Sequence, residues 1–148
     1  MAPGPRPLSG RSLMDVFTPD QRSALMARIR AKNTKPEFLV RRIVHALGYR
    51  FRLHRRDLPG TPDLVFPRLK KIIFVHGCFW HQHAGCQFAY KPKSNSTFWR
   101  KKFSENIARD ERAICELQEL GWNVLVVWEC RTREPATLLR KLRTFLQK

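Results

Sequence analysis

Residues 72–86 of this chain read IIFVHGCFWHQHAGC. The first four residues are apolar and predict a buried strand, and the strand leads directly into a loop that is dense in metal-binding side chains. Five side chains at the end of this stretch can bind a metal ion or carry a proton, namely His76, Cys78, His81, His83 and Cys86. Their mixture with two adjacent aromatic rings indicates a functional site projected from the end of a rigid strand.

Length and charge limit the class of protein. The chain has 148 residues and a formal net charge of +17, with 29 Lys and Arg against 12 Asp and Glu. We expect a disordered tail over residues 1–14, which are rich in Pro and Gly, and a single domain over residues 15–148. The positive excess predicts a polyanionic partner. Nucleic acid is favoured over an anionic membrane because no basic amphipathic stripe and no apolar span of membrane length is evident.

Turn and capping signals predict the order of the elements. A capping box at residues 18–21 opens a short basic helix with Arg22, Arg28 and Arg30, which is either a solvated helix or one that contacts DNA phosphates. A second capping box at residues 34–37 opens a helix that ends at Gly48. Strands are expected at residues 49–53, 64–66, 71–75 and 122–128, and helices at residues 97–120 and 135–147.

Three of these predictions concern burial. The strand at residues 122–128 is nearly continuous in apolar residues and should be buried on both faces. The helix at residues 97–120 should bury one face, formed by Phe103, Ile107, Ile114, Leu117 and Leu120. Cys115 is expected in the core, because free cysteine is among the most buried residue types.

The cysteines indicate a metal site. Four cysteines without a signal peptide or a membrane span fit a reducing cytoplasm, where metal ligation is favoured over disulfides. Cys78, His83 and Cys86, together with Cys130 at the end of the fourth strand, form a set of three sulfurs and one nitrogen that suits tetrahedral, structural Zn²⁺. The alternative is a group of buried thiols without a metal.

A second group contains carboxylates and imidazoles. Asp63 begins a short strand and His81 follows its neighbour, with His76, Glu37 and Asp110 as further members. A carboxylate suits Mg²⁺ and an imidazole suits proton transfer, so the pair predicts hydrolysis of a phosphodiester. Two simpler interpretations stay open: Asp63 as an ordinary turn residue, and Glu37 as a capping residue that returns a hydrogen bond to the amide of Thr34.

The order of helix, three strands, helix and strand resembles the α/β core of the restriction-endonuclease-like nucleases, a central mixed four-stranded sheet flanked by helices. The usual Glu-x-Lys of their third strand is missing, since residues 75–77 read VHG. A closer resemblance rests on LPGTPD at residues 58–63, FVHGCFWH at 74–81, QELGW at 118–122 and VWEC at 127–130. These motifs, and the spacing of Arg22, Met26 and Ile29, resemble the very short patch repair (Vsr) mismatch endonucleases over residues 15–145.

The resemblance implies an activity. It implies a nick in double-stranded DNA on the 5′ side of a thymine mispaired with guanine, the T:G mismatch left when 5-methylcytosine deaminates. Asp63 and the backbone carbonyl of Val75 would bind Mg²⁺, and His81 would act as the base with His76, Glu37 and Asp110 in support. Cys78, His83, Cys86 and Cys130 would hold the structural Zn²⁺.

The resemblance also implies a DNA wedge and partners. Phe79, Trp80 and Trp99 match the aromatic residues that insert beside the mismatch, although Trp99 could instead cap the core next to Phe103. The expected partners are a cytosine-5 methyltransferase, a MutL-type mismatch-repair protein and a repair polymerase. The enzyme would be a monomer in the bacterial cytoplasm, associated with the nucleoid. Two rivals are a module that binds distorted DNA without cutting it and a restriction-type nuclease of the same fold.

Overall fold

The computed structural model describes residues 34–148. Within this range the elements are α2 (Lys35–Ala46), β1 (Arg52–Leu53), β2 (Leu64–Phe66), β3 (Lys71–His76), α3 (Ser96–Glu119), β4 (Asn123–Trp128), the 3₁₀ helix η2 (Glu129–Arg133) and α4 (Pro135–Gln147). The predicted order of helices and strands is therefore confirmed from residue 34 onward. The predicted tail, the first capping box and Arg22, Arg28 and Arg30 lie outside the described residues.

The four strands form one mixed sheet in the order β1-β2-β3-β4. β2 pairs antiparallel with both β1 and β3, whereas β4 runs parallel to β3. The parallel register pairs Lys71 with Asn123 and continues to His76 with Trp128. Both strands therefore end at the same edge of the sheet, and the loop after β3 meets η2 there.

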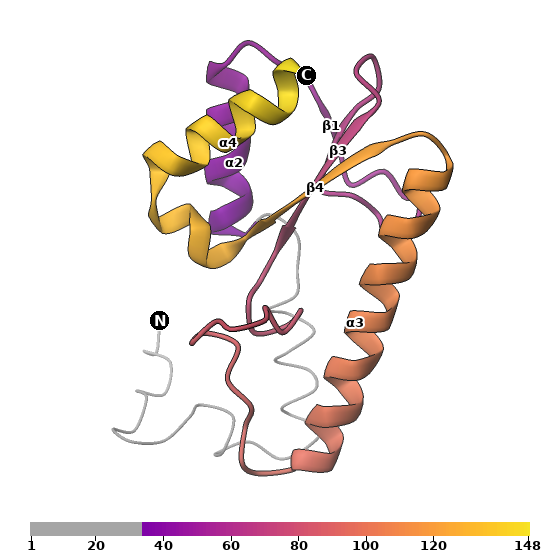
Figure 1. The fold of residues 1–148 in the computed structure, drawn as a ribbon, viewed down its shortest axis with the longest axis vertical. Coiled ribbons are helices and arrows are strands. Elements are labelled where there is room, and N and C mark those ends of the chain that lie inside the picture. The colour runs from indigo at the N-terminus through magenta and orange to yellow at the C-terminus, as the bar shows by residue number, and fades with distance from the viewer. Residues whose placement is uncertain (1–33) are drawn as a thin grey trace, which may run out of the picture. The chain divides into compact units, whose positions relative to one another are not determined.

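Helices cover both faces of the sheet (Figure 1). On one face, α2 and α4 pack side chains such as Val44 and Leu142 against Leu64 and Ile73. On the other face, α3 contributes Leu117 to a second cluster with residues of β2 and β3. This three-layer α/β arrangement agrees with the predicted mixed sheet flanked by helices. No helix within residues 34–148 is long and apolar enough to cross a membrane.

Two strand predictions need correction. The first strand covers only Arg52–Leu53, not residues 49–53, because only these two residues pair with β2, Arg52 with Val65 and Leu53 with Leu64. The prediction that β4 is buried on both faces is wrong for most of the strand. It contacts both hydrophobic clusters, but as an edge strand it fully buries only Val127.

The predicted face of α3 is also partly wrong. Its buried residues are Trp99, Phe103, Asn106, Ala113 and Leu117, whereas Ile107 and Leu120 are exposed. Cys115 is exposed as well, so the expectation of a core cysteine is wrong. The reason is helical geometry: residue 115 lies two positions from both Ala113 and Leu117, which places it on the opposite side of the helix.

Candidate active site and cysteine cluster

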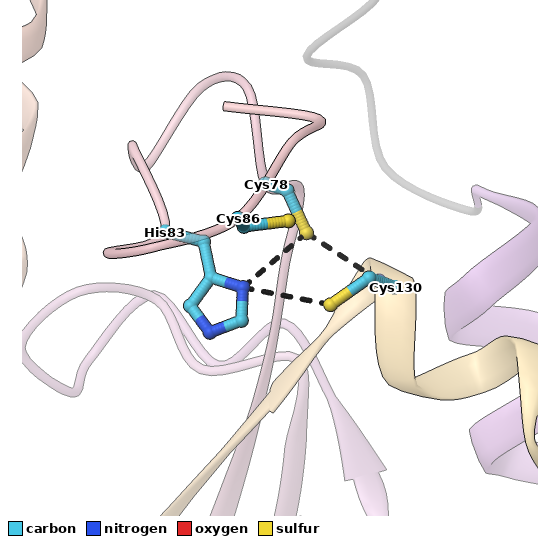
Figure 2. A group of neighbouring side chains, drawn as sticks. All are labelled: Cys78, His83, Cys86 and Cys130. Atoms are coloured by element: carbon cyan, nitrogen blue, oxygen red, sulfur yellow. Dashed lines mark hydrogen bonds between the residues drawn. The ribbon is translucent and has the colours of Figure 1, made fainter. Parts of the chain in front are cut away.

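The cysteine cluster forms where β3 and β4 end. The parallel register that pairs His76 with Trp128 places residue 130 opposite residue 78, and the backbone N–H of Cys130 donates to Cys78 Sγ at 3.4 Å. Figure 2 shows the four side chains converging, with Cys78, His83 and Cys86 from the loop after β3 and Cys130 from η2. The predicted set of four is therefore brought together by the sheet.

The spacing within the cluster suits a tetrahedral ion. His83 Nδ1 lies 3.8 Å from Cys78 Sγ and 3.5 Å from Cys130 Sγ, and all four ligand atoms lie within 4.8 Å of one another. Metal–sulfur bonds of about 2.3 Å and metal–nitrogen bonds of about 2.0 Å place tetrahedral ligands roughly 3.5–3.8 Å apart. These four residues could therefore hold a metal ion without rearrangement of the backbone.

His83 is oriented by its surroundings. Its ring stacks on Trp128 with centroids 4.2 Å apart and 9° between the planes. Burial and the nearby cations Arg131 and Lys141 lower the pKa of His83, which favours the neutral ring that a metal requires. The two-residue gap between His83 and Cys86 is accommodated by Gly85, whose φ of +70° turns the loop back toward the cluster.

Asp63 lies at the start of β2, beside the carboxyl end of β3. Its Oδ2 accepts a hydrogen bond of 2.7 Å from the backbone N–H of Val75. Because N–H and C=O of one residue in an antiparallel ladder point toward the same neighbouring strand, the Val75 carbonyl faces the Asp63 side as well. Burial raises the pKa of Asp63 to about 7, and the negative charge of Glu37 adds to the rise.

Glu37 and Asp63 form a buried acidic pair with a third residue. Glu37 Oε2 accepts from Arg41 at 2.9 Å and lies 3.1 Å from Nε2 of His54, which in turn lies 3.7 Å from Asp63 Oδ1. The helix cap is formed by Thr34, whose Oγ1 accepts a hydrogen bond of 3.4 Å from the N–H of Glu37. The buried carboxylate of Glu37, the half-buried carboxylate of Asp63 and one histidine make a group that could hold a cation.

Sequence reasoning did not identify His54. The residue follows a short alternating segment and has no motif around it, so its meeting with Glu37 and Asp63 depends on the pairing of β1 with β2. One signal in the sequence could have suggested it: His54 is the only residue in positions 49–56 whose side chain commonly serves as a metal ligand.

The imidazoles form a separate group one residue beyond Val75. His76 and His81 stack with ring centroids 3.9 Å apart and 5° between the planes. His81 Nδ1 is hydrogen-bonded to Asp110 Oδ2 of α3 at 2.5 Å. Burial and the neighbouring His81 lower the pKa of His76 to about 3, so His76 is neutral at physiological pH. The structure thus supplies His81 with a carboxylate on one side and an uncharged ring against its face.

The predicted wedge residues belong to one aromatic cluster. The Phe79 ring lies 5.2 Å from Trp80 and 5.5 Å from Trp99, and Trp99 packs on Phe103 at 5.5 Å. Trp80 and Trp99 are buried, and Phe79 is half-buried. The structure therefore places Trp99 against Phe103, the alternative position named for it. Its buried indole Nε1–H has no hydrogen-bond partner within the described residues.

Several known proteins are similar to this chain in sequence. The family profile described as DNA mismatch endonuclease Vsr matches residues 14–87. The chain is 48% identical over 134 residues to the type II nicking enzyme V.XorIIP of Xanthomonas oryzae pv. oryzae, covering 90% of this chain and 98% of that protein. It is 40% identical over 130 residues to the type II nicking enzyme V.NmeAIP of Neisseria meningitidis, covering 88% of this chain and 92% of the relative.

A third relative carries the name of the family itself. The DNA mismatch endonuclease Vsr of Escherichia coli K12 is 40% identical over 121 residues, which cover 82% of this chain and 77% of that enzyme. The profile match spans the acidic pair, both imidazoles and three of the four residues of the cysteine cluster. The chain therefore belongs to the Vsr family of DNA mismatch endonucleases.

Proposed function

We propose that this endonuclease nicks double-stranded DNA on the 5′ side of the thymine in a T:G mismatch and so begins very short patch repair. Family membership supports an endonuclease that acts in DNA mismatch repair. The observation that carries the proposal is the arrangement at the end of β3. Asp63 is bonded to Val75, and the next residue, His76, stacks on the His81–Asp110 pair.

The acidic pair suits a divalent cation. Burial, with a smaller contribution from the negative charge of Glu37, raises the pKa of Asp63, and a bound cation would offset the cost of ionising this carboxylate. Asp63 and the Val75 carbonyl would hold Mg²⁺, with Glu37 close by. When bound, the ion supplies positive charge that stabilises the phosphate and the departing 3′ oxygen.

His81 is placed to handle the proton. Its Nδ1 is held by Asp110, which fixes the ring and leaves Nε2 to accept a proton from the attacking water. His76 stays neutral and therefore adds no positive charge that would oppose protonation of its stacked neighbour. Attack by water on phosphorus with departure of the 3′ oxygen would leave a 5′-phosphate and a 3′-hydroxyl.

The cysteine cluster would hold structural Zn²⁺. Its ligand distances fit a tetrahedral ion, and it joins the loop that carries His81 to the end of β4. A closed set of four protein ligands leaves no position for a substrate, so the role of the ion would be to fix this loop. With its mixed sheet and site at the strand ends, the fold would be of the restriction-endonuclease-like type.

The aromatic cluster would supply the wedge. Phe79, the most accessible of the three, would enter the base stack first, and Trp80 and Trp99 would have to leave their buried positions. Among residues 34–148 the buried N–H of Trp99 has no hydrogen-bond partner, and a buried donor left without one costs roughly 1–3 kcal/mol. A mispaired step is cheaper to unstack than a matched one, which favours insertion there.

The biological setting follows from the same proposal. Repair of this lesion would place the enzyme in the bacterial cytoplasm at the nucleoid, as a monomer. It would act together with a cytosine-5 methyltransferase that generates the methylated base, a MutL-type mismatch-repair protein and a repair polymerase. The phosphate contacts expected from Arg22, Arg28 and Arg30 belong to the same proposal.

A nicking assay tests the function directly. Duplexes that differ only in one pair, T:G or T:A, are incubated with the enzyme with and without added Mg²⁺. The expected result is an Mg²⁺-dependent nick 5′ of the thymine in the T:G duplex alone. Cleavage of both duplexes would indicate a restriction-type nuclease, and tight binding of T:G DNA without cleavage would indicate a recognition module.

A matched pair of variants assigns the site. Asp63→Asn should abolish nicking and keep DNA binding, because it removes the buried charge and retains the acceptor for the Val75 N–H. Asp57→Asn is the control, since the carboxylate of Asp57 is exposed and pairs with Arg55 away from the acidic pair. Full nicking by Asp63→Asn would refute the assignment of Asp63.

A further inference from the structure

His54 occupies an unusual backbone position beside the acidic pair. It follows β1 with a φ of +47°, in the left-handed region that non-glycine residues rarely adopt. Its backbone N–H donates to the carbonyl of Asp63 at 3.4 Å, which extends the β1–β2 pairing by one residue. Strained positions of this kind persist where the surrounding structure holds them and concentrate at ligand-binding sites.

The side chain of His54 lies between two carboxylates. Nε2 is 3.1 Å from Glu37 Oε2 and 3.7 Å from Asp63 Oδ1. The side chains of all three residues are mostly buried, with exposed fractions of 11% for His54, 7% for Glu37 and 18% for Asp63. A single N–H at Nε2 cannot satisfy both acids, and Glu37 Oε2 already accepts from Arg41.

The same distances fit three ligands of one ion. The ligand atoms of Glu37, His54 and Asp63 all lie within 4.8 Å of one another. Octahedral bonds of about 2.1 Å place neighbouring ligands about 3 Å apart and opposite ligands about 4.2 Å apart. The separation of 3.1 Å between His54 and Glu37 matches a neighbouring pair, and 3.7 Å to Asp63 lies between the two values.

We propose that His54 Nε2 is a ligand of the divalent ion at the nuclease centre, together with Glu37 and Asp63, and that it makes the site prefer first-row transition ions over Mg²⁺. The proposal rests on the proposed function, because it concerns the same metal centre. Imidazole nitrogen suits transition ions, whereas Mg²⁺ prefers oxygen ligands and keeps its waters. Ligation uses the unprotonated Nε2, so the His54 proton would lie on Nδ1 and the contact with Glu37 would be bridged by the ion.

Metal titration without DNA tests the proposal. Mn²⁺ is the weakest binder of the first-row series and so the most stringent probe. Mn²⁺ and Mg²⁺ are titrated calorimetrically into the full-length protein, after its zinc content has been measured. We expect Mn²⁺ to bind about tenfold or more tightly than Mg²⁺, and His54→Ala to weaken Mn²⁺ about tenfold and Mg²⁺ less than about threefold.

Two further variants control the measurement. His45→Ala removes an exposed histidine of α2 and should change neither affinity. His54→Gln offers an amide oxygen in place of nitrogen and should reduce the difference between the two ions to less than about threefold. It serves in place of His54→Ala if that variant unfolds. Equal affinity for both ions in the native protein would overturn the proposal, as would equal losses for both ions in His54→Ala.

Pulsed electron paramagnetic resonance of bound Mn²⁺ gives a direct readout. An imidazole nitrogen coupling should be present in the native protein, His45→Ala and His81→Ala, and should be lost in His54→Ala. A coupling that persists in His54→Ala would overturn the proposal. Asp63→Asn distinguishes the metal centre of the proposed function from the ligand role of His54. If Asp63→Asn abolishes binding of both ions while His54→Ala has no effect, the metal centre is supported and the role of His54 is refuted. Unchanged binding in Asp63→Asn would refute the metal centre itself.

Discussion

The buried charge of Asp63 should make the metal-free protein less stable as pH rises. The pKa of Asp63 rises from 3.8 to about 7 on folding. A group whose folded pKa is raised is bound to its proton more tightly in the folded state. The contribution of Asp63 to the free energy of unfolding is therefore greatest below about pH 4, and it is lost progressively as the pH rises from about 4 to about 7.

The size of the effect follows from the shift. A rise of about 3 pKa units corresponds to a loss of about 4 kcal/mol once the pH exceeds the folded pKa. Close to 2 kcal/mol of this is already lost at pH 5, because the unfolded carboxyl is ionised there. Between pH 5 and pH 8 the remaining loss is on the order of 2–3 kcal/mol.

Asp63→Asn isolates this contribution. Asparagine keeps an oxygen that accepts from the Val75 N–H and cannot ionise. Urea unfolding of both proteins at pH 5 and pH 8 is measured without added divalent ion and without chelator, so that the cysteine cluster is left undisturbed. All other titrations are common to the two proteins and cancel in the difference.

We expect the free energy of unfolding of Asp63→Asn, relative to that of the native protein, to be about 2–3 kcal/mol higher at pH 8 than at pH 5. Added Mn²⁺ or Mg²⁺ should reduce the stability difference between the two proteins at pH 8, because the ion binds the Asp63 carboxylate and stabilises only the native protein. A stability difference that does not change between the two pH values would refute the reasoning that burial makes this charge costly.

Other perturbations test the remaining parts of the structure. Cys130→Ala should lose bound zinc and lower the melting temperature, whereas Cys115→Ala, at an exposed position outside the cluster, should change neither; unchanged zinc content in Cys130→Ala would contradict the cluster. Lys71 of β3 is buried, and its Nζ donates to three backbone oxygens at the end of α4. Lys71→Met should therefore lower the free energy of unfolding in urea by about 2–3 kcal/mol, whereas Lys141→Met, at an exposed position of α4, should change it little. Asp110→Asn should slow nicking of T:G DNA by about 100-fold or more, because it weakens the hydrogen bond that orients His81. DNA affinity, measured by fluorescence anisotropy, should stay the same. An unchanged nicking rate would exclude a role of Asp110 in orienting His81.

Local sequence signals predicted the elements well where each element is set by its own residues. The Thr34 cap, the apolar strand at residues 71–76 and the helix at residues 135–147 all depend on side chains that lie close in sequence. Burial was harder to predict. Cys115 and Ile107 are exposed because of the direction in which α3 faces the sheet, and β4 is only half-buried because it lies at the edge.

The site divides in the same way. All four members of the cysteine cluster were predicted, because three of them lie within nine residues, thiols and imidazoles are known metal ligands, and Cys130 was expected at the end of the last strand. Only the parallel register of β3 and β4 brings Cys130 to them. His54 carries no recognisable motif, and its place between Glu37 and Asp63 results from strand pairing and a left-handed backbone conformation.

The sequence by itself therefore determined which secondary-structure elements form, which side chains can bind a metal and how basic the protein is, because all three follow from local patterns and composition. Tertiary structure decided which of these groups meet. Val75 contacts Asp63, and Cys130 contacts Cys78, because segments distant in the chain meet at one edge of the sheet. The physical reason is that the hydrogen-bond register and the packing depend on two segments at once, so the local sequence of one segment does not specify them.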